Sequence, residues 1–174
     1  MNRLVTAAVF LLGGATLVGV AGTAGADGHD RPLLVRAWLT GFEETPLTLS
    51  SPGRGFFRAT VDEDAGTIEY SLTYDGVANV AQSHLHLGAH HTTGGISVFL
   101  CSNLGNGPAG TQACPQSPGQ ISGTIHSADV IGPTGQGIAA GEFAELVKAI
   151  RSKVVYVNVH SQQFPGGEIR GQLL

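Results

Sequence analysis

Residues 67–74, Thr-Ile-Glu-Tyr-Ser-Leu-Thr-Tyr, alternate strictly between polar and apolar side chains. Successive side chains of a β-strand point to opposite faces, so this pattern collects the four apolar residues on one face. It predicts a half-buried antiparallel strand with one face toward a core and the other toward solvent. The acidic and glycine-containing residues 62–66 before it predict a hairpin turn that joins it to an earlier strand.

The rest of the chain after the first 33 residues has the same organisation. Further short strands are predicted at residues 34–41, 55–61, 80–87, 96–101, 120–126, 153–160 and 168–173, separated by turn residues. The 26 glycines of the chain suit many tight turns. Residues 141–152 differ, because their apolar side chains recur at helical spacing. The sequence therefore predicts one all-β domain over residues 34–174, an antiparallel β-sandwich or barrel with one short helix.

The first 26 residues have the organisation of a secretory signal peptide. A short positive segment, Asn2-Arg3, precedes an apolar run over residues 4–20, and small residues follow at 24–26. We expect cleavage after Ala26 and export to the extracellular space or cell envelope. The apolar run is about long enough to span a bilayer, so an uncleaved anchor is the alternative. No later stretch is apolar enough to span a membrane.

Charge and cysteine content restrict the partners and the compartment. The formal net charge of −4 argues against nucleic acid, whose binders need a basic face. The only two cysteines, Cys101 and Cys114, flank a stretch rich in glycine, proline and asparagine. In an oxidising compartment this arrangement predicts a disulfide that closes the loop. A metal–thiolate pair is the alternative, but zinc sites use much shorter gaps between cysteines.

Three histidines on two predicted strands form the candidate functional site. His84 and His86 are two residues apart, so they share one strand face while Leu85 and Leu87 share the other. Near the end of the chain, His160 lies on a valine-rich strand with the same alternation. Two imidazoles from one strand and a third from a neighbouring strand could chelate one ion, and nitrogen-rich sites suit copper or zinc.

Two further histidines and three polar residues leave alternatives open. His90 and His91 follow the His-x-His strand, and either is a candidate fourth ligand, although exposed loop positions suit them as well. The alternative for the three strand histidines is a purely structural hydrogen-bonded cluster with Asn158, Glu168 and Arg170 as partners. No other arrangement of nucleophile, base and acid in the sequence points to catalysis.

The order of these landmarks resembles the CHRD domain, a family named from chordin and common in exported bacterial proteins. The resemblance rests on Leu-Thr-Gly-Phe-Glu-Glu-Thr-Pro at 39–46, the alternating strand at 67–74, Ser-His-Leu-His-Leu-Gly at 83–88, and Tyr-Val-Asn-Val-His-Ser with Phe-Pro-Gly-Gly-Glu-Ile-Arg-Gly-Gln-Leu at 156–173. It implies an immunoglobulin-like or dismutase-like antiparallel β-sandwich in an exported protein. It implies little about activity, because fold analogy does not establish function.

These observations predict a secreted, non-enzymatic binding module that holds copper or zinc. One alternative is a module that binds an extracellular protein or the matrix and uses its histidines structurally. The other is a copper-redox enzyme, because His-x-His followed by a late histidine is similar to the copper half of copper–zinc superoxide dismutases. That similarity is partial, since no residue here can be assigned as the bridging histidine, the zinc-binding aspartate or the steering arginine of those enzymes.

Overall fold

The computed structural model describes residues 32–174, so the predicted signal peptide lies outside the described residues. The order of the elements along the chain agrees with the sequence-based prediction. The strands are β1 (Leu33–Thr40), β2 (Arg54–Asp62), β3 (Thr67–Asp75), β4 (Val80–Leu87), β5 (Ile96–Ser102), β6 (Gly119–Ile125), β7 (Val155–Ser161) and β8 (Ile169–Gln172), and the helices are α1 (Phe143–Arg151) and the short 3₁₀ turns η1 (Gly41–Glu43), η2 (Ser127–Asp129) and η3 (Thr134–Gln136).

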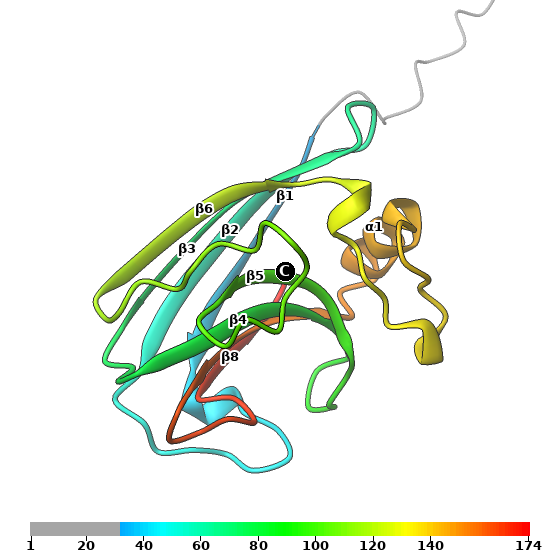
Figure 1. Ribbon diagram of the computed structural model, residues 1–174. Coiled ribbons are helices and arrows are strands. Elements are labelled where there is room, and N and C mark those ends of the chain that lie inside the picture. Colours follow the sequence, from blue (N-terminus) through cyan, green and yellow to red (C-terminus); the bar gives the residue numbers. More distant parts are fainter. Residues whose placement is uncertain (1–31) are drawn as a thin grey trace, which may run out of the picture. The chain divides into compact units, whose positions relative to one another are not determined.

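The eight strands form one antiparallel sheet in the order β5-β4-β7-β8-β1-β2-β3-β6. The sheet curls so that the two halves of this order face each other, and its edge strands β5 and β6 come close together (Figure 1). One hydrogen bond that spans the halves runs from the Tyr70 hydroxyl on β3 to the Leu100 carbonyl on β5, at 3.2 Å. The predicted all-β fold is therefore confirmed, in the form of a nearly closed barrel.

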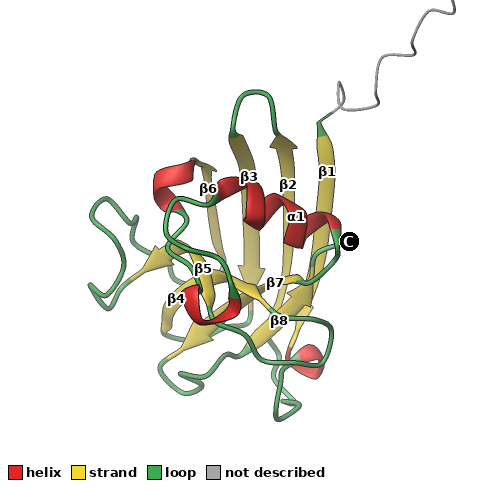
Figure 2. Ribbon diagram, turned by 90° about the vertical axis from the view of Figure 1, so that its right-hand side faces the viewer, coloured by secondary structure: helices red, strands yellow, loops and turns green. Residues whose placement is uncertain are grey.

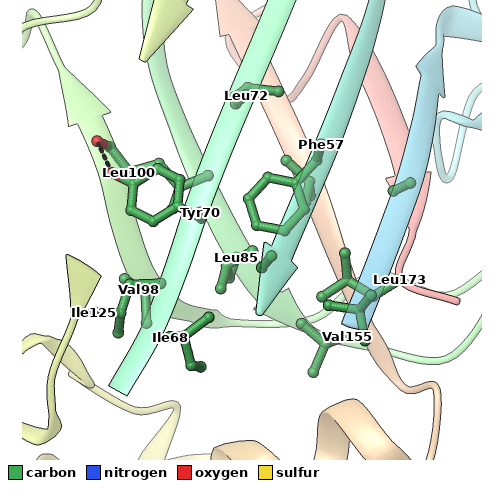
Figure 3. Close-up of a cluster of buried hydrophobic side chains, with 14 of the residues drawn as sticks. Phe57, Ile68, Tyr70, Leu72, Leu85, Val98, Leu100, Ile125, Val155 and Leu173 are labelled. Atoms are coloured by element: carbon green, nitrogen blue, oxygen red, sulfur yellow. Dashed lines mark hydrogen bonds between the residues drawn. The ribbon is translucent and has the colours of Figure 1, made fainter. Parts of the chain in front are cut away.

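The core lies between the two halves of the curled sheet. Phe57, Ile68 and Leu72 are fully buried and come from the β2–β3 half. Leu85 and Val155 approach them from the half that contains β4 and β7 (Figure 3). Each of these residues belongs to the apolar face that alternation in its strand defines, so burial of about 1.5–3 kcal/mol per large side chain fixes the register of every strand.

The helix and the disulfide complete the domain. Helix α1 (Figure 2) begins after Gly141, whose φ of +84° suits glycine, and it buries Leu146, Val147 and Ile150 in the same core. The predicted disulfide between Cys101 and Cys114 is present. Within residues 32–174, no helix is both long enough and apolar enough to cross a membrane.

Candidate metal centre

The three strand histidines come together because β4 and β7 are neighbours in the sheet. In the antiparallel register, His84 lies opposite Asn158, and His160 lies opposite Gln82. His84, His86 and His160 therefore share the face of the sheet that points away from Leu85 and the core, as the alternation predicted. They are nevertheless buried, with exposed fractions of 0%, 8% and 6%, because loops cover this outer face.

One nitrogen from each of the three rings lies within 4.8 Å of the others. The closest approach is between His84 Nδ1 and His160 Nε2, at 3.1 Å. Two nitrogen ligands of one ion with bonds near 2.0–2.1 Å lie about 2.9–3.4 Å apart, so this pair already has the spacing of a chelate. For all three nitrogens to reach this spacing, the His86 ring has to approach the other two by up to about 1.4–1.9 Å.

Hydrogen bonds to backbone carbonyls decide which nitrogens carry lone pairs. His86 Nδ1 donates to the carbonyl of Gly94, and His160 Nδ1 donates to the carbonyl of Pro165, both at 3.0 Å. In a neutral imidazole the second nitrogen is then an acceptor, so Nε2 of each ring carries a lone pair. Without an ion, His160 Nε2 accepts a hydrogen bond from His84 Nδ1, whereas His86 Nε2 has no partner among the described residues. Such carbonyl partners are the usual orienting groups of metal-bound histidines.

Two of the ring nitrogens have no partner within the protein. Nε2 of His84 and Nε2 of His86 are fully buried and accept or donate no hydrogen bond. Leaving a buried polar atom unsatisfied costs roughly 1–3 kcal/mol, and native proteins seldom tolerate it twice in one cluster. The donor set therefore fits a transition-metal ion better than it fits a closed network of hydrogen bonds.

The electrostatics keep all three rings neutral. Burial, together with the neighbouring His160 and His86, lowers the pKa of His84 to about 2. Burial lowers the pKa of His86 to about 4, although the bond to Gly94 opposes this shift. Burial also lowers the pKa of His160, against the opposing effect of the Pro165 carbonyl. Neutral imidazole is the form that binds metal ions.

The loop between β4 and β5 is fastened over the histidines. The Arg170 guanidinium on β8 donates to the carbonyls of Thr92 and Ala89, at 2.8 and 3.2 Å. It also lies 3.6 Å from the centre of the Tyr156 ring, a cation–π contact. That ring stacks on His86, with centroids 4.8 Å apart and planes within 3°. Arg170 and Tyr156 thereby hold both the loop and one of the ligand rings in place.

The polar residues named as hydrogen-bond partners of the histidines have other partners. Asn158 donates to both carboxylate oxygens of Glu44, at 3.0 and 3.1 Å. Glu168 accepts a 2.6 Å hydrogen bond from the Ser51 hydroxyl. That part of the structural alternative was wrong, because these side chains lean toward the loop after β1 rather than along the sheet. The alternation of the strands could not reveal this. Glu44 lies in the segment 39–46 that supports the family resemblance, but its pattern assigned it no partner, and the two backbone carbonyls carry no side-chain signal.

His90 and His91 lie in the loop after β4 and are exposed. His90 Nε2 lies 3.1 Å from Glu43 Oε2, and its ring contacts that of His91 at a centroid distance of 3.9 Å. Neither belongs to the group whose nitrogens converge around His84, His86 and His160. A role for either as a fourth ligand stays a prediction.

Fold and site together define an all-β, disulfide-containing domain with a buried cluster of neutral histidines. The chain belongs to the CHRD domain family, whose model matches residues 35–173. This match confirms the resemblance drawn from the sequence. Searches of curated proteins and of solved structures found no match.

Proposed function

We propose that this CHRD domain binds one transition-metal ion, copper or zinc, through His84, His86 and His160. The observation that carries the proposal is the convergence of one nitrogen from each of the three buried rings within 4.8 Å, where His86 Nε2 has no partner among the described residues. A cation bound by the three rings would satisfy the lone pairs that the carbonyl bonds of His86 and His160 leave free.

In this proposal the protein is an exported binding module rather than an enzyme. Complete burial of His84, and near-complete burial of the other two rings, favours an ion that is held and exchanged slowly. A catalytic metal needs a coordination position that substrate can reach. The disulfide is consistent with an oxidising compartment.

The test is to titrate copper(II) and zinc(II) separately, at pH 7, into protein purified without a histidine tag. Isothermal titration should give one equivalent for at least one of the two ions. The copper form should show nitrogen hyperfine structure in its electron paramagnetic resonance spectrum, since the ligands are imidazoles. His84→Gln and His160→Gln should each abolish stoichiometric uptake while the near-ultraviolet circular dichroism spectrum persists.

His126→Gln is the matched control, because His126 is exposed and lies outside the cluster. It should bind the ion like the unaltered protein. Uptake below one equivalent, or uptake that His84→Gln and His160→Gln leave intact, would remove this site from consideration. A protein partner recovered instead would support the interaction-module alternative.

A further inference from the structure

The outer face of β1, β2, β3 and β6 carries an exposed tryptophan beside a half-buried phenylalanine. Trp38 is 72% exposed, and it lies directly opposite Phe56 in the β1–β2 register. Their ring centroids are 4.5 Å apart. Two hollows on the surface meet here, since both are lined by Trp38, Phe56, Thr40 and Gln120. An exposed tryptophan that packs on a half-buried phenylalanine in a concave surface indicates a binding site.

An arginine pair occupies the next position along the same two strands. Arg36 lies directly opposite Arg58 on the outer face, and both are exposed. Like charges in this arrangement repel each other and destabilise the sheet. Neither arginine forms an ion pair with any residue of 32–174. On a chain with a net charge of −4, two adjacent unpaired arginines provide a local anion site.

The sheet extends both pairs into rows of hydrogen-bonding groups. Next to Phe56, the register continues with Thr73 on β3 and Gln120 on β6. Next to Arg58, it continues with Ser71 and Ser122. These two rows, which we call the platform, contain no carboxylate. The four strands make the platform about 14 Å wide, with the two rows about 7 Å apart.

The carboxylates near the platform lie outside these two rows. Glu69 is opposite Thr60, one row beyond the arginines. Asp75, beyond the aromatic row, is paired with Arg54. Two copies related by an axis through the arginine pair would bring arginines against arginines, so a separate anionic occupant suits this pair better than a second copy does.

We propose that the platform binds an acidic polysaccharide built from uronic acid sugars. The apolar C–H face of a sugar ring stacks on Trp38 and Phe56. Arg36 and Arg58 bind the carboxylate of that sugar or of its neighbour. The remaining polar residues of the platform bind hydroxyl groups, and these are Thr73, Gln120, Ser71 and Ser122. Guanidinium groups suit carboxylates because they offer several parallel N–H donors.

Trp38 is the single tryptophan of the chain, so its fluorescence reports on the platform alone. Titration with an oligogalacturonate, in chelator so that the histidine cluster plays no part, should change the emission in a saturable way. Arg36→Gln and Arg58→Gln should each weaken binding about tenfold or more, the loss expected for a charge-assisted contact. Trp38→Ala, followed by calorimetry, should abolish binding.

Arg151→Gln is the matched control, because it removes the same charge from an exposed residue away from the platform. It should bind like the unaltered protein, and a neutral maltooligosaccharide should not bind. The proposal is overturned if oligogalacturonate causes no saturable change in Trp38 emission. It is also overturned if Arg151→Gln weakens oligogalacturonate binding as much as Arg36→Gln and Arg58→Gln do. Equally tight binding of poly-glutamate, which has carboxylates without sugar rings, would also overturn it and indicate an acidic peptide.

Discussion

Binding of an ion to the histidine cluster should stabilise the folded protein, and this effect is measurable without knowledge of a partner. The cluster exists only in the folded state, because His84 and His160 belong to different strands and meet 76 residues apart in sequence. An ion that binds the folded state alone raises the free energy of unfolding by mass action. When the free ion concentration is 100 times the dissociation constant, the free energy of unfolding rises by about 2.7 kcal/mol.

For a domain of this size, each kcal/mol shifts the midpoint of thermal unfolding by about 2–4 °C. Saturating copper or zinc should therefore raise the midpoint by about 5–11 °C. His160→Gln should remove the gain, because it deletes the ligand nitrogen that lies 3.1 Å from His84 Nδ1. The same variant without ion should be somewhat less stable, since the Pro165 carbonyl loses the ring N–H that it accepts.

Differential scanning calorimetry with and without each ion measures both effects. The reasoning is refuted if the ion shifts the unaltered protein and His160→Gln equally, since the stabilisation would then come from elsewhere on the molecule. It is also refuted if a titration shows saturable binding at these histidines but the midpoint does not move. His126→Gln should shift like the unaltered protein.

The structure predicts the effects of three other substitutions on stability or ion uptake. Burial raises the pKa of Glu44 from 4.5 to about 7, so the folded state keeps a proton that the unfolded state releases between these values. The lowered pKa values of the three buried histidines act in the opposite direction over part of this range, and equally in Glu44→Gln. The stability of the unaltered protein relative to that of Glu44→Gln, measured by urea unfolding, should therefore fall by about 3 kcal/mol as pH rises from 4 to 8. Replacing both Cys101 and Cys114 by alanine should lower the free energy of unfolding by about 3 kcal/mol, measured likewise in urea. Gly94→Ala should destabilise the fold and weaken ion uptake, because a Cβ there overlaps a carbonyl oxygen of β4, whereas Gly135→Ala, in open space, should do neither.

A contrary result has a definite meaning in each case. A stability difference between the unaltered protein and Glu44→Gln that does not change with pH would show that the Glu44 carboxyl is ionised in the folded state. Unchanged stability without the disulfide would mean that the loop it closes is already constrained in the unfolded chain. Full stability and ion uptake in Gly94→Ala would show that the covering loop can move away from β4 without cost.

Local pattern predicted the strands and the helix well. The alternation over 67–74 lies within the observed strand Thr67–Asp75, and the helix predicted over 141–152 is observed at Phe143–Arg151. It begins two residues later than predicted because Gly141 has a left-handed backbone conformation and cannot form part of the helix. Such signals depend only on neighbours in the chain, which is why they can be read from sequence.

The candidate site was predictable in part. Strand period alone placed His84 and His86 on one face and His160 on the corresponding face of its own strand. Their burial was not predictable, since it depends on the loop that Arg170 fastens by two bonds to backbone carbonyls. Backbone acceptors such as Gly94 and Pro165 carry no side-chain signal, and only the folded loops show where their carbonyls point.

The pairing of β4 with β7 has a consequence for the order of events during biosynthesis. His84 and His86 leave the ribosome long before His160, and β7 is itself flanked in the sheet by β8, the last strand of the chain. A chain that lacks β7 offers an ion only two of the three imidazoles, on a strand that is paired with β5 alone. Tight binding of the ion therefore requires that β7 and β8 have been synthesised and inserted into the sheet. Metal retention would distinguish such molecules from truncated or misassembled ones.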